Sequence, residues 1–219
     1  MAIKGTVTAK CSGKGCLEED VEVWSFVRGD TDPDLRERLI AGDLNLITCE
    51  TCGALYFPEA TVVYYDPGIE MLAFIFPESY KKEEARWRKK MLEDYGQMKT
   101  VLGDKKGVEY EPVLFFGMDA AASALNSEEN LEDEVHIAKI LAPGLDLDIF
   151  SVDRAYARKE GLPRMLPHMK KKSAQGGERE SVLAALMILL KENGKLSGYR
   201  RWVSRLSNSG ELPTEAGLR

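Results

Sequence analysis

The residues whose types and spacing most clearly indicate chemistry are four cysteines, in a chain of 219 residues. Cys11 and Cys16 are separated by four residues, Cys49 and Cys52 by two, and no cysteine follows them. A structural zinc site holds its Zn²⁺ tetrahedrally with four ligands, which two short turns can supply in pairs. The two pairs therefore predict one structural Zn²⁺ site with the ligands Cys11, Cys16, Cys49 and Cys52.

Two other chemistries for these cysteines are a redox dithiol and a catalytic zinc. A thioredoxin-like dithiol lies at a helix N-terminus, which lowers the pKa of its first thiol. Cys49 and Cys52 instead follow a strand-like segment and precede residues 53–58, which do not begin a helix. A catalytic zinc keeps one coordination position open and usually has His or carboxylate ligands. The pattern therefore favours a closed, structural site.

Other candidate residues have simpler explanations. Glu132 and His136 are four residues apart and could share a metal, but a solvated acidic helix face explains them better. His168 lies in a proline-containing connector, where a surface position is the simpler interpretation. A basic and aromatic group could bind nucleic acid, although an exposed loop and a helix with a solvated basic face explain it better. Its members are Lys170, Lys171, Lys172, Arg200, Arg201, Trp202 and Arg205.

Composition is typical of a soluble globular protein, with 44% hydrophobic and 30% charged residues. No N-terminal signal and no membrane-spanning run is evident, so we expect a cytoplasmic protein without membrane contact. The net charge of −6 is uneven, because residues 1–149 are acidic and residues 150–219 carry a net charge of +7. An acidic cysteine-containing part makes nucleic acid an improbable partner. Attraction between the oppositely charged ends, or to a second subunit, is the simpler expectation.

The elements that must position the cysteines are mostly strands. Alternating or apolar residues predict strands at 6–9, 21–27 and 44–48 and a hairpin of 61–65 with 71–76. A helix is expected between Asp32, with Pro33 at its first position, and Gly42. The hairpin strands are almost continuously apolar, which predicts a sheet covered on both faces. Residues 79–99 place Trp87 and Met91 at helical spacing and are the expected cover.

The second half of the sequence is expected to be mainly helical. A strand is expected at 113–116, and helices are expected from Asn126 or Ser127 to about Leu141, from Ser151 to near Gly161, over 182–190 and over 199–206. The glycines of 103–107 mark an exposed loop. The sequence thus predicts an α+β protein with a zinc-ribbon-like β module and covering helix in residues 1–103 and a mainly helical domain in residues 104–219.

Three segments, together with the cysteine pairs, resemble the CpXC domain of bacterial and archaeal proteins. They are Asp-Pro-Asp-Leu-Arg-Glu-Arg-Leu-Ile-Ala-Gly-Asp-Leu-Asn at 32–45, Thr-Cys-Glu-Thr-Cys-Gly at 48–53 and Tyr-Tyr-Asp at 64–66. The resemblance covers roughly residues 5–100 and implies a zinc-binding domain without an established activity. Two departures are the four-residue spacing of the first pair and the presence of Ser12 and Glu50 where the family's proline is usual.

The function expected from the sequence is a binding, regulatory or assembly role for a structural zinc module, with a protein partner or self-association. The sequence contains no phosphate-binding glycine loop, no Gly-x-Ser-x-Gly and no His-Glu-x-x-His motif. Catalysis is therefore not the leading expectation. Two alternatives stay open: an enzyme with a carboxylate-based site between the two halves, and a nucleic-acid binder that uses the basic C-terminal helices.

Overall fold

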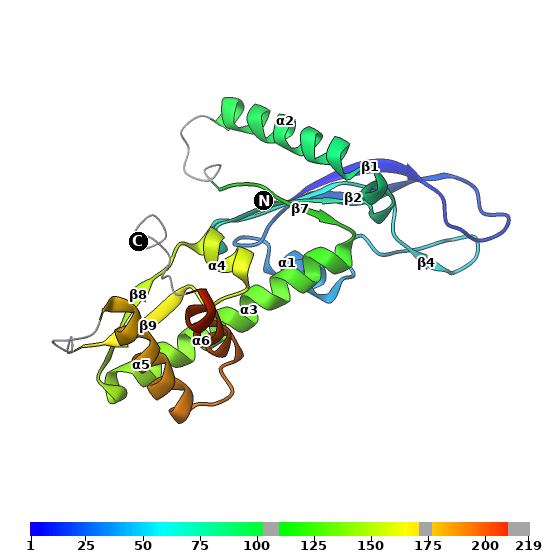
Figure 1. Cartoon of the computed structure of the whole chain (residues 1–219). Coiled ribbons are helices and arrows are strands. Elements are labelled where there is room, and N and C mark those ends of the chain that lie inside the picture. Colours follow the sequence, from blue (N-terminus) through cyan, green and yellow to red (C-terminus); the bar gives the residue numbers. More distant parts are fainter. Residues whose placement is uncertain (103–109, 171–176, 210–219) are drawn as a thin grey trace. The chain divides into compact units, whose positions relative to one another are not determined.

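The computed structural model describes residues 1–102, 110–170 and 177–209 and has the predicted mixed α+β composition (Figure 1). Contacts divide the chain into two compact units, Met1–Leu125 and Asn126–Arg219, each with its own hydrophobic core. The predicted boundary between residues 103 and 104, and the loop predicted at 103–107, lie outside the described residues.

The first unit is built on a five-stranded sheet with the order β1-β2-β5-β6-β7. Neighbours β1 and β2 are antiparallel, as are β5 and β6, whereas β2 with β5 and β6 with β7 are parallel. The predicted hairpin is therefore the centre of the sheet. The strands are β1 Ile3–Ala9, β2 Glu19–Arg28, β5 Val62–Asp66, β6 Met71–Phe76 and β7 Val113–Phe116.

Helices cover both faces of this sheet, as the apolar strands predicted. All six residues of β6 are buried. On one face, Leu72, Phe74 and Phe76 pack with Met91 and Trp87 of α2 (Glu84–Leu102). On the other face, Ala73 and Ile75 pack with α1 (Pro33–Ala41) and with the beginning of α3 (Met118–Leu141). The predicted helix over 79–99 differs at its beginning, where η2 (Glu78–Glu83) forms a 3₁₀ turn.

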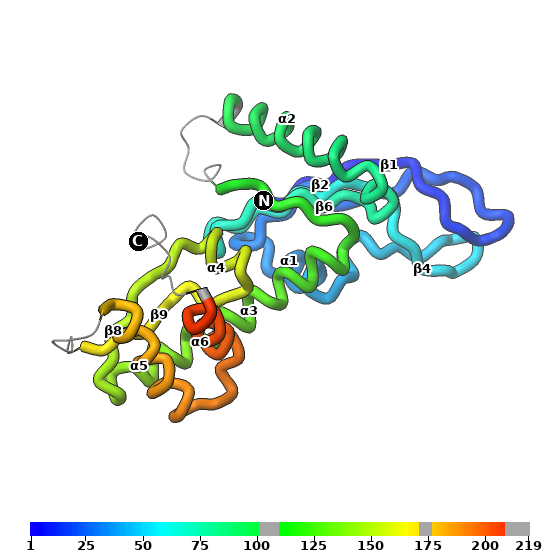
Figure 2. Tube along the Cα trace, viewed as in Figure 1, coloured from blue at the N-terminus to red at the C-terminus, as the bar shows by residue number. Residues whose placement is uncertain are grey.

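The segment between β2 and β5 carries α1 and the second cysteine pair (Figure 2, blue to cyan). The left-handed Gly42 ends α1 as predicted. The strand predicted at 44–48 is reduced to β3 (Ile47–Thr48), which pairs with β4 (Leu55–Tyr56). The reason is Asn45, whose φ of 63° is incompatible with a strand. Its side chain instead exchanges two hydrogen bonds with the backbone of Trp24 in β2.

The second unit consists mainly of helices, as predicted, around a two-stranded sheet. Its core contains Leu166, Leu186, Leu189, Tyr199 and Trp202, each with 0% exposure. The elements are the rest of α3, η3 Ala142–Leu145, β8 Leu147–Ser151, α4 Arg154–Glu160, β9 Met165–Met169, α5 Glu178–Glu192 and α6 Ser197–Ser209.

Three sequence predictions for this half were wrong in detail. The helix expected to begin at Asn126 or Ser127 begins at Met118, because the alanines at 120–122 favour a helix and extend it in the amino-terminal direction. The helix expected to begin at Ser151 begins at Arg154, after the N-cap Asp153. The connector expected around His168 is strand β9, antiparallel to β8. Pro167 is tolerated there because a strand of a two-stranded sheet has a free edge.

Candidate metal centre

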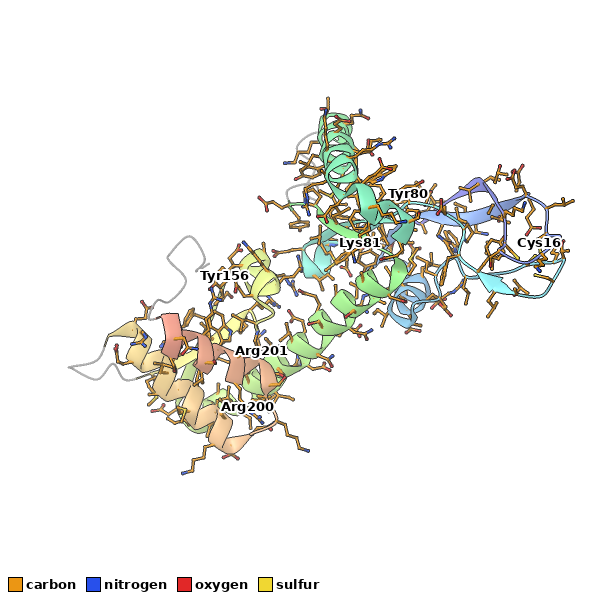
Figure 3. All side chains as sticks on the ribbon, turned by 45° about the vertical axis from the view of Figure 1, so that its right-hand side comes forward. Cys16, Tyr80, Lys81, Tyr156, Arg200 and Arg201 are labelled. Carbon is orange, nitrogen blue, oxygen red and sulfur yellow. The ribbon has the colours of Figure 1, made fainter. Side chains whose placement is uncertain are left out.

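Two turns of the first unit bring the four cysteines together. Cys11 and Cys16 lie in the connection between β1 and β2, and Cys49 and Cys52 lie in the connection between β3 and β4. Their ligand atoms all lie within 4.8 Å of one another. The Sγ atom of Cys11 is 3.4 Å from that of Cys16 and 3.4 Å from that of Cys52, and the Sγ atoms of Cys16 and Cys49 are 3.7 Å apart. The predicted residues therefore form one cluster, which lies around the label Cys16 in Figure 3.

The dimensions of this cluster suit a tetrahedral thiolate site. Four sulfurs at about 2.3 Å from a central Zn²⁺ lie about 3.8 Å from one another. The sulfur–sulfur distances in the cluster, from 3.4 Å up to at most 4.8 Å, lie on both sides of that spacing. Cys11, Cys16 and Cys49 are buried and Cys52 is exposed. The donor set thus fits a metal ion that prefers soft ligands in a closed site.

The first turn achieves this geometry despite its four intervening residues. The backbone N–H of Gly13 donates a hydrogen bond to Sγ of Cys11 at 3.2 Å, and the N–H of Cys16 donates to the carbonyl of Gly13. A Cβ atom on residue 13 would lie 3.0 Å from the sulfurs of both Cys16 and Cys52. Glycine at this position therefore allows the backbone of the longer loop to lie close to the sulfurs. The four-residue spacing of the first pair thus still brings its ligands together with those of the second pair.

The second turn stabilises a thiolate at Cys49. Hydrogen bonds from the backbone N–H groups of Cys52 and, secondarily, Thr51 lower the pKa of Cys49 to about 7. The pKa of Cys16 is raised by its hydrogen bonds with Cys11 and Cys52, because neighbouring thiols compete for the negative charge. A cation among the four sulfurs would remove this competition. Gly53, directly after Cys52, has a φ of 72°, a left-handed conformation that glycine adopts without strain.

Tyr56 connects the cluster to the β1–β2 ribbon. Its ring packs against the buried cysteines, and its hydroxyl donates a hydrogen bond to Glu19 at 3.1 Å. Because Glu19 begins β2 and Tyr56 belongs to β4, this hydrogen bond links the segments that follow the two cysteine turns.

The comparison with protein families identifies the chain. The family model described as "CpXC protein" matches residues 10–134, more than half of the sequence. The chain belongs to the CpXC protein family. This match contains all four cysteines of the CpXC chain and also β7 and most of α3, so it extends beyond the segment that carried the resemblance. Neither the comparison with curated proteins nor that with solved structures gave a match. None of the helices in the described ranges could cross a bilayer.

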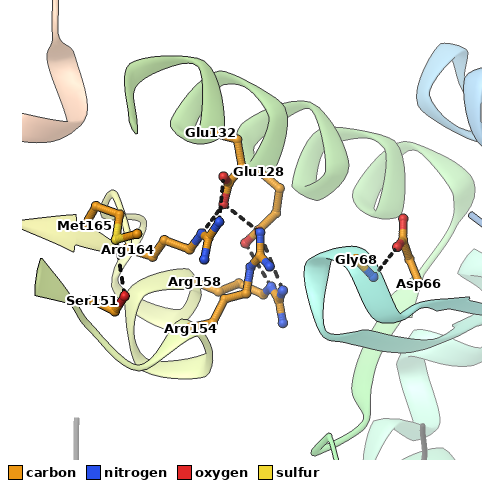
Figure 4. Close-up of polar contacts among 9 residues, drawn as sticks. All are labelled: Asp66, Gly68, Glu128, Glu132, Ser151, Arg154, Arg158, Arg164 and Met165. Carbon is orange, nitrogen blue, oxygen red and sulfur yellow. Dashed lines mark hydrogen bonds and ion pairs between the residues drawn. The ribbon is translucent and has the colours of Figure 1, made fainter. Parts of the chain in front are cut away.

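The other metal candidate is engaged in ion pairs. Glu132 contacts Arg154 and Arg164, each at 2.6 Å (Figure 4). Burial tends to raise the pKa of Glu132, but the two guanidinium groups outweigh it, so this pKa lies below its ordinary value. Across the described ranges, the four cysteines are the one group of Cys, His, Asp and Glu that meets at metal-binding distance. Glu132 and His136 are therefore not brought together with further ligands.

Sequence reasoning missed that the acidic face of α3 organises the second unit. Glu128 pairs with Arg158 at 2.8 Å, and its side chain is 9% exposed (Figure 4). The carboxylate of Glu134 accepts hydrogen bonds from the backbone N–H groups of Gly198 and Tyr199 at the beginning of α6. Glu128 and Glu132 of α3 are four residues apart, as are Arg154 and Arg158 of α4. This matching spacing is the sequence signal from which the ion pairs could have been predicted.

The described members of the basic and aromatic group near the C-terminus, which we considered as a possible nucleic-acid surface, have different surroundings. Trp202 is buried and its indole N–H donates a hydrogen bond to the carbonyl of Pro163 at 2.8 Å. Arg205 forms an ion pair with Glu160. Arg200 and Arg201 are exposed on α6 (Figure 3), and Lys171 and Lys172 lie outside the described residues. The aromatic side chain that could stack on a base is thus part of the core.

Proposed function

We propose that the N-terminal unit of this CpXC protein is a structural zinc module. The observation that supports this is the convergence of four cysteine sulfurs from two turns within 4.8 Å. Zn²⁺ would be held by Cys11, Cys16, Cys49 and Cys52 and would supply a crosslink between the β1–β2 and β3–β4 connections. Thiols stay reduced in the cytoplasm, the expected location, where paired cysteines serve as metal ligands more often than as disulfides.

The role that we infer for this module is binding, regulation or assembly through a protein partner or a second copy of the chain. A four-thiolate site leaves no coordination position for a substrate, which supports a structural role over metal-based catalysis. Glu132 and Glu128 are neutralised by arginines, which disfavours them as a catalytic carboxylate pair.

Metal analysis of the purified protein tests the zinc assignment. We expect about one equivalent of zinc per chain, and Cys52→Ser should lower the zinc content and the thermal stability together. Ser12→Ala changes a side chain of the same turn without removing a ligand and is the matched control. A zinc content below half an equivalent, or unchanged folding of the Cys52→Ser variant, would refute the proposal.

A further inference from the structure

A cavity of about 580 Å³ lies in the first unit, at the carboxyl ends of the parallel strands β6 and β7. Phe76 and Phe116 end these strands and line it, together with residues 57–60, the beginning of η2 and the beginning of α3. In sheets with parallel strands, ligands commonly bind outside the carboxyl ends, in pockets of roughly 300–1,000 Å³. The position of this cavity and its volume both fall within the ranges that such sites have.

One part of the lining is apolar and aromatic. Phe57 is 45% exposed, so part of its side chain is accessible from the solvent. It lines the cavity with Pro58, Pro77 and the two strand-end phenylalanines. Such a surface binds the aliphatic stem of a ligand, and an aromatic face also attracts a cation.

The charged part of the lining is mainly acidic. Glu59, Glu78 and Asp119 contribute carboxylates, whereas Lys81 is the one basic residue among the described residues of the lining and lies 3.7 Å from Glu78. The amino end of α3 would by itself attract an anion. The carboxylate of Glu78 is already the anion at this position, since a Cβ atom on Gly117 would lie 2.8 Å from one of its oxygens. The lining therefore carries an excess of negative charge beside aromatic rings.

We propose that this cavity binds the alkylammonium or alkylguanidinium group of a ligand. The apolar stem lies against Phe57, and the charged head lies among the carboxylates of Glu59, Glu78 and Asp119. A basic side chain of a partner protein and a free aliphatic amine share this chemistry. None of the four cysteines lines the cavity, so the proposal does not depend on which ion the cluster holds.

The test is a titration of the full-length protein, labelled with ¹⁵N, with three probes. They are the peptide acetyl-Leu-Arg-Leu-amide, the same peptide with neutral citrulline in place of arginine, and 1,5-diaminopentane. We expect the arginine peptide or the diamine to shift the amide resonances of Phe57, Ser79 and Gly117, and which of them binds more tightly identifies the source. If the citrulline peptide binds as tightly as the arginine peptide, or if neither cation shifts these resonances, the proposal is wrong.

Two isosteric variants test the role of the carboxylates. Glu78→Gln and Glu59→Gln should each weaken binding of the cation about fivefold, the factor that corresponds to about 1 kcal/mol for a partly exposed charge pair. Glu37→Gln removes an exposed carboxylate of α1 and should leave the affinity unchanged. Glu59 is exposed, so its variant keeps the test valid if Glu78→Gln does not fold. Unchanged affinity in a folded Glu59→Gln variant would contradict the proposal.

Discussion

Replacing Asn45 tests how the second cysteine turn is attached to the sheet. The side-chain oxygen of Asn45 accepts a hydrogen bond from the backbone N–H of Trp24 at 2.7 Å, and its amide donates to the carbonyl of Trp24 at 2.9 Å. β2 pairs with β5 over Phe26–Arg28, which does not include Trp24. The Asn45 amide therefore supplies the hydrogen bonds that a neighbouring strand would give to Trp24. It thereby attaches the segment that leads into β3 and Cys49.

The expected magnitude follows from two separate effects. Each neutral hydrogen bond contributes about 1 kcal/mol to the free energy of unfolding, so Asn45→Gly should destabilise the first unit by about 2 kcal/mol. Alanine loses the same two bonds and must also adopt the left-handed φ of 63°, which adds about 1 kcal/mol. Asn45→Ala should therefore destabilise the unit by about 3 kcal/mol, more than glycine does.

Hydrogen–deuterium exchange of peptides from β2 is the appropriate assay, because it reports on the first unit even if the two compact units unfold separately. Asn130→Ala, at an exposed position of α3 in the second unit, is the control and should leave exchange in β2 unchanged. A destabilisation below about 0.5 kcal/mol in both Asn45 variants would refute the structural role of the amide. A glycine variant less stable than the alanine variant would refute the strain argument.

Three further outcomes are expected. Gly29→Ala would place its Cβ 2.1 Å from the hydroxyl of the buried Tyr64, so thermal unfolding should show a loss of more than about 2 kcal/mol; an unchanged melting temperature would contradict this. The ion pairs lower the pKa of Glu132, so their contribution to the free energy of unfolding is full above the ordinary Glu pKa and is lost as the pH falls through the lowered value. Glu132→Gln should therefore make the free energy of unfolding less sensitive to acid, and an unchanged dependence of that free energy on pH would contradict this. Trp202→Phe should cost about 1 kcal/mol in urea denaturation through loss of the indole hydrogen bond, and no change would show that this bond is dispensable.

Local signals were sufficient to predict much of the first unit. Asp32, Pro33 and Gly42 define the ends of α1 through backbone preferences that act within a few residues. The four cysteines were grouped correctly because metal ligands are few in kind and their spacing is restrictive. The apolar hairpin indicated a sheet covered on both faces, since alternation disappears when both faces are buried.

The misses concern features that depend on distant partners. The segment 118–125 lacks a strong apolar period, and it is helical because Ala121 and Leu125 pack onto the sheet. Pro167 disfavoured a strand locally, but the partner strand β8 determines the pairing. Trp202 seemed a surface residue among basic neighbours, whereas the core of the second unit surrounds it. None of these contacts lies within the window that a periodicity argument examines.

The two parallel pairings in the sheet have a consequence for how the first unit reaches its native state. β2 cannot join β5 until the intervening chain, with α1 and the second cysteine turn, has been arranged, and β6 must likewise wait for α2 before it meets β7. Such sequence-distant pairings raise the contact order and slow folding without lowering equilibrium stability. Until these pairings form, the apolar strand β6 lacks its helical cover, and the partly folded unit is exposed to aggregation.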